Sequence, residues 1–370
     1  MKYIDEYRNF DAVKAVSKKI HDISKKEISI MEICGGQTHT ILKYNIEQFL
    51  PENITLIHGP GCPVCVTSVT LIDKAISLAS RDDVILVSFG DMLRVPGFVQ
   101  DLLSVKAIGG DVRMVYSPLD AVKIAIGNPD KKIVFFAVGF ETTAPSNARS
   151  VLEAKKLNLK NYYLLCANML VPPAIEALMN NKNVKIQGLL AAGHVCTVMG
   201  LKEYEIIAEK YHIPIVATGF EPFDIISGIY EAVRQIEEEQ HEVVNRYSRA
   251  VTREGNIHAQ KLIEQVFDTV DKEWRGIGAI PQSGLSLKDE FSKFDADKNF
   301  KFNCIEIKEN TNCIAGEILQ GIKKPVDCLS FGNACNPEHP LGAPMVSSEG
   351  ACAAYFRYRK DKAKDTFISV

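Results

Sequence analysis

The sequence lacks the features that mark membrane, secreted and nucleic-acid-binding proteins. Its longest strongly apolar run, residues 133–140, is far shorter than the roughly 20 residues that span a bilayer. The N-terminal residues have no apolar core of the kind found in signal peptides. Lys plus Arg is 43 and Asp plus Glu is 46, a net charge of -3, so no global basic field is present. We therefore expect a cytoplasmic protein that binds neither nucleic acid nor a membrane.

The common nucleotide-binding signatures are also missing. The chain contains no G-x-x-x-x-G-K-[ST] and no G-x-G-x-x-G after a strand-like run. These absences argue against a P-loop ATPase and against a generic NAD enzyme. Hydrophobic residues still make up 46% of 370 residues, enough to build a sizeable core without disulfides.

Short apolar runs alternate with helical patterns through the first 220 residues or so. Runs of this kind, each followed by an amphipathic helix, indicate parallel βαβ units. We predict an α/β protein with two consecutive α/β domains, at 27–118 and 119–223. A third, helical and loop-rich domain would combine 1–26 with 224–370. In it we expect one long helix over 225–247, another over about 256–270, and mostly loops after Trp274.

Ten cysteines are many for a reducing compartment, so thiolate chemistry or metal binding is the leading question. Four near the end have the spacing C-x14-C-x6-C-x16-C: Cys313, Cys328, Cys335 and Cys352. Soft thiolates from loops suit an iron–sulfur cluster or zinc. Structural zinc usually shows close C-x2-4-C pairs, so this spacing favours a [4Fe–4S] cluster. Cys304 lies in a segment of alternating apolar residues, and we expect it to have a structural role.

Three further cysteines lie just after strand-like runs. Cys34 precedes Gly35 and Gly36, which let the backbone approach a ligand closely, and His39 could reach the same site. Cys62 and Cys65 form C-P-V-C, the arrangement of a redox dithiol. A zinc site would need a second such pair, and the sequence has none.

Polar residues follow other strand-like runs as well. Asp91, Glu141 and His194 each come after an apolar run. Alone, Asp91 could be a helix cap. Together these residues predict a cleft at the carboxyl edge of the sheets, where ligands bind in α/β proteins. We expect Cys166 and Cys196 to be packed in the core.

The combined motifs resemble those of one family, the HypD hydrogenase maturation proteins. The resemblance runs from about Cys34 to Tyr358 and rests on long, unusual motifs. They are CGGQTH at 34–39, GPGCPVC at 59–65, FGDMLRVPG at 89–97, GFETTAP at 139–145 and the closing MVSSEGACAAYFRY. The chain departs from the family where members often show C-x-C-G, because only Cys313 is present there, followed by Ile314, Ala315 and Gly316.

The resemblance implies two Rossmann-like domains and a third domain with a [4Fe–4S] cluster. It implies a scaffold and redox factor for assembling the Fe(CN)2(CO) group of [NiFe]-hydrogenases. The partners would be a HypC-like small chaperone and a HypE-like cyanide donor. Cys34 would bind the iron, Cys62 and Cys65 would be the redox pair, and the four late cysteines would hold the cluster. We further expect electrons to pass from the cluster through Cys62 and Cys65 to the iron site.

Two other functions remain open from the sequence. One is a cluster-dependent thiol–disulfide reductase of the thioredoxin-reductase type, in which Cys34 would have no role. The other is a structural zinc protein. Whether the protein is an enzyme in its own right is left open by the residues alone.

Overall fold

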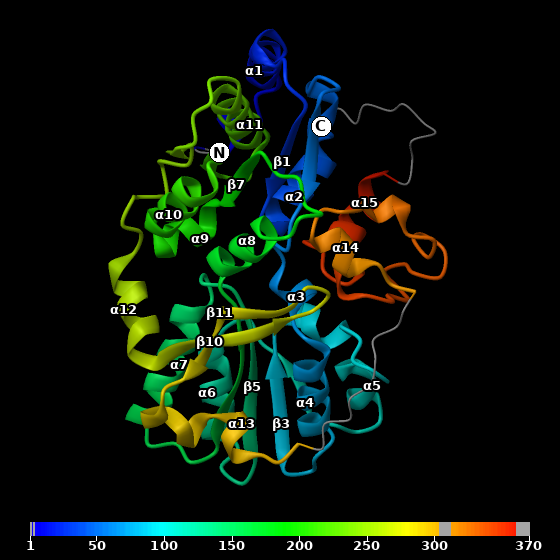
Figure 1. The fold of residues 1–370 in the computed structure, drawn as a ribbon. Helices are drawn as coiled ribbons and strands as arrows, with labels where there is room; N and C mark the ends of the chain where they lie inside the picture. The colour runs from blue at the N-terminus through cyan, green and yellow to red at the C-terminus, as the bar shows by residue number, and fades with distance from the viewer. Residues whose placement is uncertain (1, 3, 303–311, 360–370) are drawn as a thin grey trace.

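The computed structural model describes residues 2, 4–302 and 312–359, so Cys304 lies outside the described residues. Figure 1 shows two stacked lobes, each built on a sheet with helices beside it. All strands within these two sheets run parallel, which confirms the predicted α/β class. The central strands are buried along nearly their whole length, as expected for parallel sheets covered on both faces.

The upper sheet has five strands in the order β2-β1-β7-β8-β9. Its strands are β1 (Ile28–Glu32), β2 (Ile54–His58), β7 (Gly188–Ala192), β8 (Ile215–Thr218) and β9 (Val243–Asn245). The lower sheet has four strands in the order β4-β3-β5-β6. Its strands are β3 (Val84–Ser88), β4 (Val112–Met114), β5 (Lys132–Gly139) and β6 (Tyr162–Asn168).

The boundary predicted near residue 118 does not separate the two sheets, and this prediction is wrong. β1 pairs with β7 as well as with β2, so the chain leaves the upper sheet after β2 and returns 130 residues later. β3 and β4, assigned to the first domain, pair within the same sheet as β5. Short buried strands have similar composition, so the sequence pattern predicts that they exist but not which of them pair.

The helices flank these sheets on both faces. They are α1 (Phe10–Ile23), α2 (Gly35–Lys43), α3 (Pro63–Val66), α4 (Val69–Ala79), α5 (Leu102–Ala107), α6 (Pro118–Gly127), α7 (Ala144–Lys156), α8 (Val171–Met179), α9 (Gly193–Met199), α10 (Lys202–Tyr211), α11 (Pro222–Glu237), α12 (Ile257–Val266), α13 (Ala296–Asn299), α14 (Ala315–Leu319) and α15 (Ala351–Arg359). Over the described residues, we find no helix with both the length and the apolar character needed to cross a membrane.

The region after residue 224 differs from its predicted form. The long helix ends at Glu237, and the segment that follows supplies β9, an edge strand of the upper sheet. The second helix ends at Val266 and continues into an antiparallel hairpin of β10 (Phe267–Trp274) and β11 (Gly278–Leu287). Figure 1 shows this hairpin lying across the junction of the two lobes. Trp274 is buried there and stacks on Phe140, with ring centroids 5.8 Å apart.

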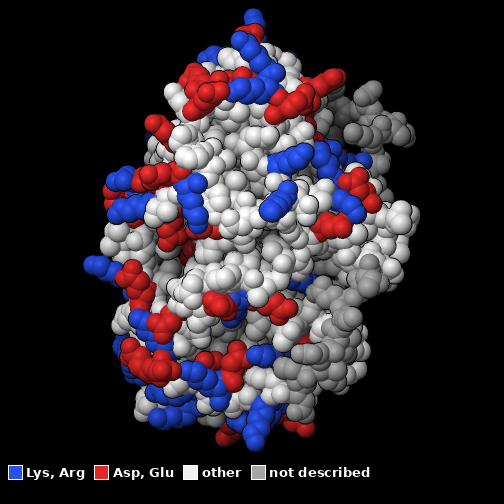
Figure 2. All heavy atoms as spheres, in the orientation of Figure 1, with Lys and Arg blue, Asp and Glu red and all other residues white. Residues whose placement is uncertain are grey.

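Charged side chains of both signs are interspersed on the face drawn in Figure 2. No extended area of one sign is visible on that face. This distribution agrees with the small net charge of -3.

Candidate functional site

The loops that follow β1 and β2 meet at the carboxyl end of the upper sheet. Cys34 comes two residues after β1 and occupies the position just before the first residue of α2. The next loop, from Gly59 to Cys65, lies directly against it, since the Gly35 N–H donates to the Gly61 carbonyl at 3.0 Å. A Cβ at Gly61 would collide with the Cys34 backbone, which explains why a glycine is needed for this approach.

The thiol of Cys34 is buried and faces one histidine. Its Sγ lies 3.6 Å from Nδ1 of His194, which comes from α9 after β7. Burial raises the pKa of Cys34 well above its usual range, and the charge of Glu349 raises it further. Burial also lowers the pKa of His194 to about 4. At neutral pH the pair is therefore a neutral thiol beside a neutral imidazole.

Cys62 and Cys65 are joined by a disulfide, and their Cα atoms are 5.2 Å apart. Both residues are buried, in the same hydrophobic cluster as Cys34. Cys62 is the N-cap of the short helix α3, and its Sγ accepts the Cys65 N–H at 3.3 Å. The C-P-V-C motif thus forms a bonded cysteine pair beside the Cys34 loop.

His39 and Asp91 both contact the C-terminal segment. His39 lies on α2, and its Nε2 is 3.1 Å from the hydroxyl of Tyr358 on α15. Asp91 accepts a hydrogen bond from the Ser347 hydroxyl at 2.8 Å. Loss of surrounding water raises the pKa of Glu349, and the charge of Asp91 raises it further. The structure thus joins Asp91 to the segment just before α15 and directs His39 toward α15 itself.

Glu141 is a buried carboxyl group two residues after β5. Its Oε1 accepts the Val171 N–H at 2.7 Å, whereas Oε2 has no hydrogen-bond partner. Burial raises the pKa of Glu141 to about 8. Among the other core residues, Cys166 and Cys196 are both buried, as expected.

Three functional-looking residues were not identified from the sequence. Glu32 and His58 are the last residues of β1 and β2, and their buried side chains bond to each other at 2.7 Å. Glu349 packs against Gly35, the residue after Cys34, where an added Cβ would come within 2.4 Å of it, and its charge raises the pKa of Cys34. The sequence signal for the first two was a polar residue at the end of an apolar run, with Glu32 two residues before Cys34 and His58 directly before Gly59-Pro60-Gly61.

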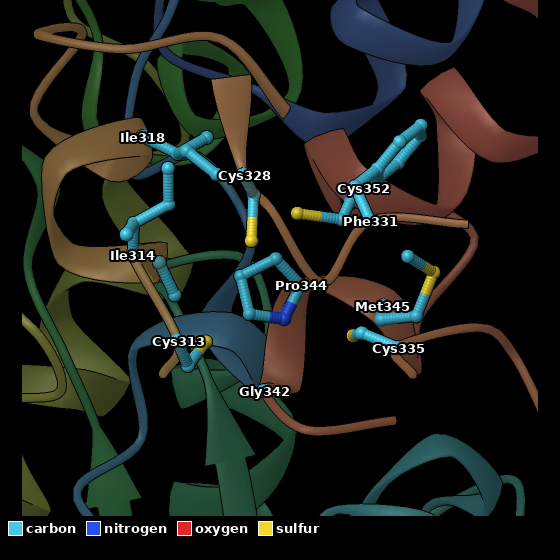
Figure 3. A pocket seen from close by; sticks show the side chains of 11 residues that line it. Cys313, Ile314, Ile318, Cys328, Phe331, Cys335, Gly342, Pro344, Met345 and Cys352 are labelled. Carbon is cyan, nitrogen blue, oxygen red and sulfur yellow. The ribbon is translucent and has the colours of Figure 1, made fainter. Parts of the chain in front are cut away.

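The four late cysteines line one pocket that is partly open to solvent. In Figure 3 their sulfur atoms point toward its middle. The remaining lining is apolar and comes from Ile314, Ala315, Ile318, Phe331, Gly342, Pro344 and Met345. A Cβ at Gly342 would lie 2.5 Å from Sγ of Cys313, so this glycine leaves room for the thiol.

The four thiols also affect one another electrostatically. Burial raises the pKa of Cys352, and the charges of Cys313, Cys335 and Cys328 raise it further. As the described residues are placed, no three His, Cys, Asp or Glu side chains could hold a single metal ion. The cysteines therefore surround a space rather than meet at a point. A set of four soft donors around an apolar pocket fits a cluster held by thiolates.

The fold and these sites define a two-lobed parallel α/β protein with a buried cysteine–histidine site, an adjacent disulfide and a thiol-lined pocket. The family model described as "HypD: Hydrogenase formation hypA family" matches residues 11–359. The chain belongs to the HypD family, which confirms the resemblance seen in its motifs.

Curated relatives match over nearly their full length. The chain is 46% identical over 368 residues to "Hydrogenase maturation factor HypD2" of Bradyrhizobium diazoefficiens, covering 97% of both chains. It is 43% identical to "Hydrogenase maturation factor HypD" of Azotobacter vinelandii, covering 98% of both chains. It is 42% identical to "Hydrogenase maturation factor HypD" of Escherichia coli, covering 98% of this chain and 100% of the relative.

Proposed function

We propose that this protein acts in hydrogenase maturation, as the scaffold and redox factor on which the Fe(CN)2(CO) group of a [NiFe]-hydrogenase is assembled. The observation that carries the proposal is the Cys34 thiol facing His194 beside the Cys62–Cys65 disulfide, in a chain of the HypD family. The iron group is cargo in this proposal, held while its ligands are attached.

Cys34 is the proposed iron anchor because a thiolate is a soft ligand suited to iron. The thiol must lose its proton to bind the metal, and His194 Nδ1 is an acceptor at 3.6 Å. With the pKa of His194 at about 4 and that of Cys34 raised, this proton transfer is unfavourable without the metal. Thiolate formation is therefore coupled to iron binding, which releases the proton.

The cysteine pair and the pocket are the proposed redox components. Opening the Cys62–Cys65 disulfide consumes two electrons and two protons and yields two thiols. Cys313, Cys328, Cys335 and Cys352 would hold a [4Fe–4S] cluster, because they line one pocket with their sulfurs turned inward. Such a cluster, when bound, would supply electron transfer.

The proposed partners are a HypC-like small chaperone, which would share the iron through its own cysteine, and a HypE-like cyanide donor. They need access to the otherwise buried Cys34.

An infrared spectrum of the anaerobically co-purified complex with the small partner tests the anchor. We expect bands of metal-bound CO and cyanide, and their loss in Cys34→Ala. Cys166→Ala is the matched control, since Cys166 is also buried but donates to the Leu285 carbonyl in the lower lobe. Bands that survive in Cys34→Ala would refute the anchor.

Iron and sulfide analysis tests the pocket separately. Anaerobically purified protein should be brown and contain both elements, and Cys335→Ala should lower their content, whereas Cys166→Ala should retain it. A colourless protein that contains zinc would overturn the cluster assignment.

A second function, thiol–disulfide reduction, is favoured by the disulfide and the thiol-lined pocket taken alone. It predicts turnover with protein disulfides that persists in Cys34→Ala. The assembly function predicts that this variant loses the infrared bands, so one substitution separates the two.

A further inference from the structure

The buried side chain of Glu32 accepts hydrogen bonds from the loop that contains Cys34. Glu32 is the last residue of β1 and is 1% exposed. Its Oε2 accepts the Cys34 N–H at 2.9 Å. Its Oε1 accepts from the Thr38 hydroxyl on α2 and from His58 Nδ1, the latter at 2.7 Å. Both oxygens of this carboxylate are thus used to fix the turn that presents Cys34.

His58 continues the hydrogen-bonded chain away from Cys34. It ends β2 and lies opposite Glu32 in the register of the two strands. When Nδ1 donates to Glu32, a neutral ring leaves Nε2 to accept from the Tyr355 hydroxyl, 3.3 Å away. The two rings also meet edge to face, with centroids 5.4 Å apart.

The series of hydrogen bonds ends at Tyr355, on the same helix as Cys352 of the thiol-lined pocket. Tyr355 is fully buried on α15, one helical turn after Cys352. The Cys34 backbone is therefore connected, through the buried side chains of Glu32, His58 and Tyr355, to the helix that carries Cys352.

Burying a carboxylate, an imidazole and a hydroxyl in one core costs free energy that apolar residues of similar size would not. The hydrogen-bonded chain instead fixes the geometry of this part of the core. Each group satisfies the hydrogen-bonding capacity of the next, and few other arrangements of these side chains would satisfy all of them.

We propose that Glu32, His58 and Tyr355 are positioning residues that couple Cys34 to α15, so that the order of the four-cysteine pocket controls how tightly the Cys34 thiol is held. The roles of the two cysteine sites rest on the proposed function. The coupling itself rests on the hydrogen bonds.

Alkylation of Cys34 in the full-length protein, followed by mass spectrometry, tests the coupling. In Tyr355→Phe the Cys34 labelling rate should rise roughly two- to tenfold, the change expected from losing one internal hydrogen bond that restrains local opening. Glu32→Gln should also raise it, because an amide has one accepting oxygen, whereas both oxygens of Glu32 accept hydrogen bonds, one of them from the Cys34 N–H. Tyr162→Phe is the matched control, as it removes a hydroxyl from another buried tyrosine, which bonds Ser150.

Labelling of buried Cys166 in the same sample distinguishes positioning from general loosening. It should stay unchanged in Tyr355→Phe. An equal rise at Cys34 and Cys166, or no rise at Cys34, would overturn the proposal.

A double variant tests the link to the pocket. Cys352→Ser should by itself speed Cys34 labelling, and Cys352→Ser with Tyr355→Phe should not exceed the larger single effect. Multiplied effects, or no effect of Cys352→Ser, would refute the coupling. Labelling uses no iron cargo, so missing infrared bands alongside intact coupling would count only against the proposed function.

Discussion

Glu141 shows at the scale of one residue how burial converts a common side chain into a pH-sensitive one. Its carboxyl group is buried with one oxygen unpartnered, and its pKa is raised from 4.5 to about 8. The folded protein therefore keeps a proton that the unfolded chain releases above its ordinary pKa. Stability is highest below about pH 4.5 as far as this group is concerned, falls as the pH rises, and levels off above about pH 8.

Glu141→Gln should remove this pH dependence while keeping the acceptor for the Val171 N–H. The free energy of unfolding of the variant, relative to the wild type, should increase between pH 5 and pH 8. The slope is at most about 1.4 kcal/mol per pH unit. Urea unfolding followed by circular dichroism at both pH values measures it. Parallel pH profiles for the two proteins would show that Glu141 is ionised in the fold.

Single residues were also where the sequence was most informative about the site. Cys34, Cys62 and Cys65 could be located because a cysteine in a glycine-rich turn after an apolar run is poorly placed to serve only as core packing. Glu32 and His58 could not, because their importance comes from the pairing of β1 with β2, which brings residues 26 positions apart into contact.

At the scale of elements, one ion pair ties several segments to the start of α11. Asp224, in the first turn of α11, is buried and forms two hydrogen bonds with Arg249, at 2.7 and 2.6 Å. The Arg249 guanidinium also lies over the rings of Tyr7 and Tyr247, 3.8 and 4.5 Å from their centroids. The N-terminal segment, α11 and the loop after β9 thus meet at this arginine.

Arg249→Ala should lower the free energy of unfolding by about 3 kcal/mol or more, because it leaves the buried Asp224 carboxylate unpaired. Arg253→Ala is the control. Arg253 makes an equally short two-bond contact with Glu205, but at the surface, where such pairs contribute less than about 1 kcal/mol. Chemical denaturation measures the free energy of unfolding of both variants. Similar decreases in the two would mean that burial does not determine how much the loss of an ion-pair partner destabilises the protein.

Most elements could be predicted from periodicity, and the errors have a physical cause. The predicted helix over 225–247 fails after Glu237 because Val243–Asn245 completes the upper sheet. The hairpin of β10 and β11 was missed because its first strand carries several charged, exposed residues and shows no continuous apolar run. Both segments take their form from contacts with distant parts of the chain.

At the scale of the whole molecule, the sheets join segments that are far apart in the sequence. The fragment 27–118 contains β1 and β2 without β7, and β3 and β4 without β5. Each sheet would lose a central strand, so we expect this fragment to be unfolded by circular dichroism and NMR. The fragment 67–187 contains all four strands of the lower sheet and should retain more helical and strand signal. A folded 27–118 fragment would restore the predicted domain boundary.

The return of the chain to the upper sheet also determines the order in which the parts of the Cys34 site emerge during translation. Cys34 leaves the ribosome early, but His194, its partner across the site, follows 160 residues later. At 5–20 residues per second this is a delay of roughly 8–30 s. During that interval the nascent Cys34 thiol has neither its imidazole nor β7 to cover it, and α15 arrives later still. A chaperone or a small partner bound to the growing chain would then meet an accessible cysteine that the finished protein encloses.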